Sequence, residues 1–139
     1  MFSCGSNALY DKSEIIPDAK WDNENKPCFD FNIDDTLTEY AFYLNIRHLE
    51  NYRYNNLYVF MSYRFPNDTI VTDTISCPLA APDGHWLGKG SGTMRSAKIL
   101  LNPNLRFPLK GDYHIEIEQA MREKVLEGIT DIGICIEKQ

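Results

Sequence analysis

The chain has 139 residues, 43% of them hydrophobic and 12% aromatic, and its formal net charge at pH 7 is −6. This length fits a single domain with a sizeable core. The acidic balance, without any Lys/Arg cluster, argues against nucleic acid as a partner. The chain also contains no apolar run of the roughly 18 residues that a membrane-spanning helix requires.

The first 26 residues are polar, carry scattered acids and include Pro17. Such a composition is typical of a linker rather than of a packed element. The sequence therefore predicts an N-terminal tether over 1–26, followed by one domain over 27–139.

From residue 28 onward, apolar residues alternate with polar ones, which is the pattern of strands with one buried face. The turn residues at 65–68 predict a hairpin between the strands on either side of them. Strands are predicted at 28–33, 39–47, 56–65, 69–75, 97–101, 105–109, 111–119 and 128–138.

Only 118–128 is compatible with a helix, of two or three turns at most. Short strands separated by turn residues indicate an all-β fold, namely a two-sheet antiparallel β-sandwich of jelly-roll-like form with at most one short helix. In the strand at 111–119, Tyr113, Ile115 and Ile117 are expected to face the core.

The segment 83–92, "DGHWLGKGSG", contains four of the eight glycines, Gly84, Gly88, Gly90 and Gly92. It does not match a phosphate-binding P-loop, because the spacing between its glycines is one residue too short and its lysine is followed by glycine. It also lacks the spacing of a dinucleotide fingerprint, so no cofactor is predicted. We interpret it as a structural loop whose glycines allow positive φ or close packing of the backbone.

Five segments have a distinctive order and spacing: "IPDAKW", "YRYNNLYVF", "DTISCPLAAPDGHWLGKGSG", "RFPLKGDYHIEIEQAMR" and "LEGITDIGICIEK". Together they resemble the gliding motility lipoprotein family, GldH, of Bacteroidetes. The resemblance runs from about Tyr10 to Lys138, which is nearly the whole chain.

The resemblance implies a lipoprotein that carries acyl chains on an N-terminal cysteine. Cys4 is the candidate, because the small residue Ser3 precedes it as in a lipobox. The apolar signal that would come before a lipobox is not part of this sequence, so the first residues are interpreted as a lipobox remnant.

The resemblance further implies a function in the envelope rather than a reaction, since no catalytic residues belong to the family. The expected protein is a non-enzymatic accessory subunit of the gliding and secretion-associated envelope machinery. Its expected partners are other, unidentified envelope proteins, and its expected location is the outer membrane, facing the periplasm.

A second interpretation is a glycan-binding β-sandwich module of an envelope lipoprotein. Tyr52, Tyr54 and Trp86 are rings of the kind that stack on sugars or anchor a protein partner, and Arg122 is a further candidate contact. The sequence leaves open whether these rings instead close one end of the core. It also leaves open whether Gln119 and Arg122 bridge a strand end to a neighbouring loop.

No metal site is predicted. The carboxylates Asp34, Asp35, Asp73 and Asp83 lie at strand ends, where they can gather on a metal ion but more often bond their own turn backbone. The three histidines and four cysteines have no spacing typical of a ligand set. The disulfide status stays open for Cys28, Cys77 and Cys135.

Overall fold

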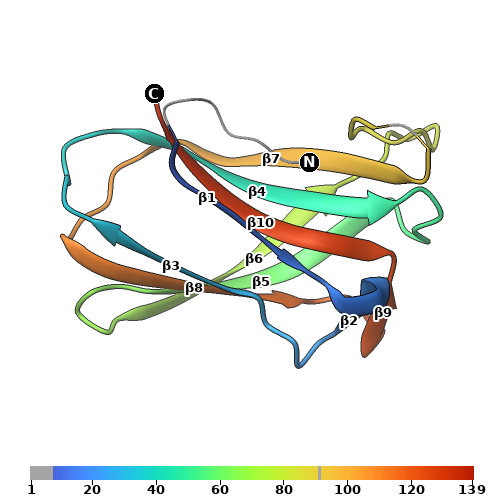
Figure 1. The fold of residues 1–139 in the computed structure, drawn as a ribbon, viewed down its shortest axis with the longest axis horizontal. Helices are drawn as coiled ribbons and strands as arrows, with labels where there is room; N and C mark the ends of the chain where they lie inside the picture. Colours follow the sequence, from blue (N-terminus) through green and yellow to red (C-terminus); the bar gives the residue numbers. More distant parts are fainter. Residues whose placement is uncertain (1–7, 91) are drawn as a thin grey trace.

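The computed structural model describes residues 8–90 and 92–139, which form two four-stranded antiparallel sheets and a short two-stranded pair (Figure 1). The strands are β1 (Ala8–Ile15), β2 (Lys20–Asp22), β3 (Cys28–Ile33), β4 (Tyr40–Leu49), β5 (Asn56–Arg64), β6 (Ile70–Pro78), β7 (Met94–Leu105), β8 (Gly111–Gln119), β9 (Val125–Glu127) and β10 (Ile129–Lys138). The only helical element in this part of the chain is a short 3₁₀ turn, η1 (Pro17–Ala19). The predicted all-β sandwich is confirmed.

The strand order is that of a jelly roll. One sheet has the order β1-β10-β4-β7 and the other β3-β8-β5-β6, while β2 pairs with β9. When the longer strands alone are counted along the chain, these orders become 1-8-3-6 and 2-7-4-5, which is the double Greek key of a jelly roll. Apart from the hairpin of β5 and β6, each connection between successive longer strands crosses from one sheet to the other.

The core lies between the two sheets and follows from the period-two alternation. In β8 the buried apolar residues are Tyr113, Ile115 and Ile117, as predicted, while the residues between them are partly exposed. Aromatic rings fill part of the space between the sheets. The ring centroids of Phe31 and Tyr113 lie 5.6 Å apart in a stacked pair, and the ring of Phe107 contacts both edge-on. These contacts hold the two sheets together by burying large apolar surfaces.

The N-terminal boundary of the domain differs from the sequence prediction. Residues 8–22 are not a tether, because β1 pairs with β10 and β2 pairs with β9. β1 is an edge strand with mostly exposed side chains, so main-chain hydrogen bonds hold it and its sequence shows no apolar alternation. Ile16 and Trp21, which are 2% and 0% exposed, fix the following segment in the core.

Two further expectations are corrected. The strands predicted at 97–101 and 105–109 are replaced by the single strand β7, which continues through Pro103. Proline is tolerated because β7 is an edge strand, where its missing N–H leaves no ladder partner unsatisfied. No helix forms over 118–128, because β8 extends to Gln119 and β9 pairs with β2, a tertiary contact that outweighs helix propensity.

Within the described residues there is no helix with the length and apolarity needed to cross a membrane. Cys28 is an exposed free thiol, and Cys77 is a buried one.

Candidate functional site

Three loops meet at one end of the sandwich, on the right of Figure 1, and we call this surface the loop end. Its described residues are 50–55 between β4 and β5, 79–90 and 92–93 between β6 and β7, and 120–124 between β8 and β9. The loop end contains all four residues that the sequence proposed as partner contacts, Tyr52, Tyr54, Trp86 and Arg122.

Trp86 is half-buried and packs against the end of the core. Its ring centroid lies 4.6 Å from that of the buried His48 and 6.5 Å from that of Tyr52. Its indole Nε1 donates a hydrogen bond of 3.1 Å to the carbonyl oxygen of Glu50, and its backbone forms a bridge with Ala80. The ring therefore joins the β6–β7 loop to the β4–β5 loop.

The two tyrosines of "ENYRYNN" occupy different depths. Tyr52 is 5% exposed, and its hydroxyl donates to the carbonyl oxygen of Asn56 at 2.9 Å. Burial raises the pKa of this hydroxyl far above its usual range. Tyr54 is half-buried, and its hydroxyl donates to Glu123 Oε2 at 2.9 Å, which raises its pKa as well. The second oxygen of Glu123 lies 3.1 Å from Arg53.

The glycines of the β6–β7 loop are explained by backbone geometry. Lys89 and Ser96 exchange main-chain hydrogen bonds of 2.9 and 2.7 Å, so the loop folds back onto β7. A Cβ at Gly88 would lie 2.7 Å from the carbonyl oxygen of Ser96, and Gly90 combines a φ of +151° with a similar clash against the Met94 carbonyl. Positive φ also occurs at the other described glycines of this loop, Gly84 and Gly92.

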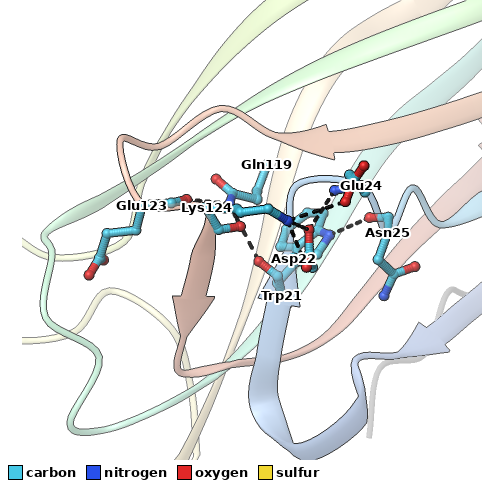
Figure 2. Close-up of polar contacts among 7 residues, drawn as sticks. All are labelled: Trp21, Asp22, Glu24, Asn25, Gln119, Glu123 and Lys124. Atoms are coloured by element: carbon cyan, nitrogen blue, oxygen red, sulfur yellow. Dashed lines mark hydrogen bonds and ion pairs between the residues drawn. The ribbon is translucent and has the colours of Figure 1, made fainter.

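Gln119 is a buried residue whose side chain links β8 to the 120–124 loop and to β2 (Figure 2). The residue is 1% exposed, and its side-chain amide donates to the carbonyl oxygens of Glu123 at 2.7 Å, Lys124 at 3.1 Å and Trp21 at 3.4 Å. Its Oε1 accepts from the backbone N–H of Met121 at 2.9 Å. One side chain thus fixes the 120–124 loop, which corresponds to the bridging alternative that the sequence left open.

An ionic contact supports the same loop from outside. Lys124 Nζ lies 2.9 Å from Asp22 Oδ1 and 3.2 Å from Glu24 Oε2, and Figure 2 shows its side chain pointing at both carboxylates. Trp21, which is fully buried, donates from Nε1 to the carbonyl oxygen of Asn25 at 2.7 Å. The 120–124 loop and the 22–25 turn are therefore held as one unit.

Arg122 is exposed, and so are Lys89 and Leu87, the last with 53% of its surface accessible. By contrast, hydrogen bonds within the protein occupy the aromatic side chains below this surface. They involve Nδ1 of His48, the hydroxyls of Tyr52 and Tyr54, and Nε1 of Trp86. The loop end therefore combines an internally bonded interior with an outer surface of mixed charge that includes Arg122, Lys89, Asp83 and Glu50 and the exposed Leu87. Exposed arginine and large apolar side chains are typical of protein contact surfaces.

His48 and Glu123 are important residues at the loop end that the sequence did not identify as such, whereas Gln119 was considered only as one of two alternatives. Glu123 meets Arg53 and Tyr54 across 70 and 69 positions of sequence. No periodicity reports a contact of that separation, so only the folded chain reveals it.

The aspartates considered for a metal or catalytic site do not gather. Asp35 accepts backbone hydrogen bonds from Leu37 at 2.8 Å and Thr38 at 3.1 Å, and Asp83 accepts one from His85 at 3.1 Å. These are turn-forming contacts. The pKa of Asp35 is lowered by the hydroxyl of Thr38 and then by the two backbone N–H groups, and that of Asp83 is lowered first by the backbone N–H of His85.

Asp73 instead lies at an apolar cavity of about 400 Å³ between the edges of β6 and β7, with Val71, Ile75, Leu101 and Leu105 among its lining. Burial and the charge of Asp73 raise the pKa of Tyr63, which also lines this cavity, to about 12. None of the partner contacts proposed from the sequence lines the cavity.

His48 predicts a pH dependence of stability. Burial lowers its pKa below the usual 6.5, with Arg95 contributing, while its Nε2 has no hydrogen-bond partner in the described structure. The unfolded chain then binds a proton more readily, so the free energy of unfolding should be constant above about pH 6.5 and fall as the pH drops below it. The lowered carboxylate pKa values act only below about pH 5, at the acid limit of this window.

Denaturant unfolding between pH 7.5 and 5 measures this effect. His48→Phe should flatten the slope, while His85→Gln, which changes an exposed histidine of the same end, should keep that of the wild type. Equal slopes for the wild type and His48→Phe would contradict the assignment to His48.

The comparisons with known proteins agree with the resemblance found in the sequence. The model of the GldH lipoprotein family matches residues 8–136. The chain is 34% identical over 143 residues to the protein named gliding motility lipoprotein GldH homolog of Christiangramia forsetii, with 98% of this chain and 87% of that protein covered. It is 31% identical over 146 residues to gliding motility lipoprotein GldH of Flavobacterium johnsoniae, with 100% and 90% covered.

Among solved structures, an uncharacterized protein of Listeria monocytogenes aligns with a TM-score of 0.38 and 14% identity, over 80% of this chain and 8% of that one. This likeness is too low to carry an argument. The match over nearly the whole length and the two relatives decide the assignment: the chain belongs to the GldH lipoprotein family.

Proposed function

We propose that this protein is a non-enzymatic, lipid-anchored subunit of an envelope assembly that supports gliding motility and the secretion associated with it. The loop end is, in this proposal, the surface that binds another protein of the assembly. The relatives named as gliding motility lipoproteins support the general assignment.

The choice of surface rests on the observation that internal contacts fix the conformation of the loop end. Gln119 makes three hydrogen-bond contacts with the 120–124 loop and a fourth with Trp21 of β2. In the β6–β7 loop, Gly88 and Gly90 stand at positions that have no room for a Cβ. A preorganised surface loses little conformational entropy on binding. Arginine is also frequent among the residues that dominate protein interfaces, and Arg122 is exposed there.

Site-specific photo-crosslinking in cells tests this surface. A photoreactive amino acid at Arg122 or Leu87 should give a crosslinked envelope protein that mass spectrometry identifies. Leu37, which is 82% exposed on the β3–β4 loop, is the matched control and should give no such product. The same product from all three positions, or from Leu37 alone, would overturn the placement.

The anchor in this proposal is a set of acyl chains on Cys4, which lies outside the described residues. Each acyl CH₂ that enters the bilayer contributes about 0.8 kcal/mol, so a multiply acylated cysteine holds a protein stably where one chain does not. When the protein is expressed in its envelope, a clickable fatty acid should label the wild type and not Cys4→Ser. Equal labelling would remove Cys4 as the anchor without affecting the proposed surface.

The proposed position is the outer membrane with the domain facing the periplasm. Protease added to intact cells should therefore leave the domain uncut and digest it once the outer membrane is permeabilised. Cleavage in intact cells would show that the domain is on the cell surface.

A further inference from the structure

The outer face of the β3–β8 pair carries four side chains with metal-binding chemistry. In the ladder, Cys28 stands opposite Glu116, and Asp30 stands opposite His114. Their neighbours Phe29 and Ile115 are buried, so the alternation of both strands turns these four residues away from the core. They form two adjacent rungs on one face, where opposite side chains come close together.

The geometry gives each residue of this group a distinct place. His114 Nδ1 lies 2.6 Å from Asp30 Oδ1, which leaves Nε2 of the ring 3.7 Å from Glu116 Oε1. The same carboxylate oxygen lies 3.8 Å from Cys28 Sγ. Ligand atoms of Cys28, His114 and Glu116 all lie within 4.8 Å of one another.

We propose that Cys28, His114 and Glu116 form a Zn²⁺-binding site, with Asp30 as the residue that positions the imidazole. Tetrahedral zinc with its usual bond lengths places two ligand atoms about 3.3–3.6 Å apart, close to the two separations above. A thiolate, an imidazole and a carboxylate are ligands that zinc accepts together. A carboxylate on the other ring nitrogen is the usual partner of a zinc-bound histidine.

The charges around the thiol favour a cation. The carboxylates of Glu116, Asp30 and Glu14 all act electrostatically on the Cys28 thiol, and no basic side chain is among the groups that do so. Zinc binding replaces the thiol proton, which passes to solvent, and the metal then supplies the positive charge that the carboxylates lack. The nearest lysine along the chain is Lys26, and its Nζ lies 3.5 Å from Glu118 Oε1, so its charge is already paired.

The site is open to solvent, since the side chains of His114 and Glu116 are 23% and 43% exposed. Three protein ligands leave a fourth position for water or for a side chain of another molecule, as in zinc sites that are not purely structural. Cys28 is 86 and 88 positions from His114 and Glu116, and these two lie two positions apart on β8. This spacing differs from that of the usual zinc motifs, so the sequence alone did not indicate the site.

Protection of Cys28 from alkylation tests the site in the intact chain. Iodoacetamide modification is read by mass spectrometry on the peptide that contains Cys28, with and without micromolar Zn²⁺. Zinc should slow modification at least tenfold, whereas Mg²⁺, a hard cation, should not. Cys77 is the internal reference, because burial raises its pKa to about 12 and it should stay unmodified in both conditions.

Variants distinguish a built site from adventitious binding to one thiol. His114→Gln and Glu116→Gln should abolish the protection, and Asp30→Asn should weaken zinc affinity about 10–100-fold. His85→Gln, which alters an exposed histidine elsewhere, should protect as the wild type does. Co²⁺ should give a thiolate charge-transfer band in the wild type that Cys28→Ser lacks.

Unchanged melting temperatures of the metal-free variants will show that they are folded, as expected for side chains on an outer face. Equal protection in the wild type and His114→Gln would overturn the proposal, and so would no protection in the wild type. Neither outcome bears on the loop end, which uses other residues.

Discussion

Replacing Gln119 with alanine is expected to lower the free energy of unfolding by about 4 kcal/mol, the largest effect that we predict for a residue of the loop end. The change removes the hydrogen bond that Oε1 accepts and the two amide protons shared among three carbonyl oxygens, from a residue that is 1% exposed. Each such bond contributes about 1 kcal/mol net, and buried groups left without a partner cost more. The melting temperature should fall by about 15 °C.

The matched control is Glu118→Ala, the neighbouring position on the opposite face of β8. Its partner Lys26 is 47% exposed, and a surface ion pair of this kind contributes less than about 1 kcal/mol. Hydrogen exchange adds a local readout, because the amide of Met121 donates to Gln119 Oε1 and should lose its protection in Gln119→Ala. If Gln119→Ala melts within a few degrees of the wild type, the 120–124 loop keeps its conformation without the Gln119 side chain.

Replacing Trp86 with alanine is expected to lower the free energy of unfolding by about 3 kcal/mol. Burying an aromatic ring fully makes its truncation cost about 3–5 kcal/mol, and the half-buried position of Trp86 places it at the low end of that range. The change also removes the indole bond to the Glu50 carbonyl and the packing against His48. Thermal unfolding should show a loss of about 10 °C.

Leu87→Ala is the control for Trp86, since it truncates the adjacent but 53% exposed side chain and should change stability by less than about 0.5 kcal/mol. Trp86→Phe should recover most of the loss, because the ring contacts stay and only the indole N–H is removed. If Trp86→Ala instead melts like the wild type and loses the product crosslinked from Arg122, Trp86 is an interface anchor and not a closing residue of the core.

The two variants also separate stability from binding. Gln119 lies under the proposed contact surface, while Arg122 lies on it. Arg122→Ala should therefore leave the unfolding curve unchanged while reducing the crosslink obtained at Leu87.

The sequence alone determined the strands whose side chains alternate between a solvent-exposed face and a buried face. The strand predicted at 111–119 agrees with β8 at both ends, because period-two burial is a local property written directly into the residues. The glycines of 83–92 were likewise interpretable, since glycine marks a backbone that needs positive φ or close approach whatever lies beside it.

Only the tertiary structure decided which strands are neighbours and which side chains meet. β1 is held by main-chain hydrogen bonds to β10, which leave no trace in a side-chain pattern, so the sequence predicted a tether over 1–26 where β1 and β2 form. Gln119 and the Cys28–His114–Glu116 group depend on strands and loops brought together from distant parts of the chain. Pairing energy depends on register between such segments, and a single sequence records the face of each strand but not its partner.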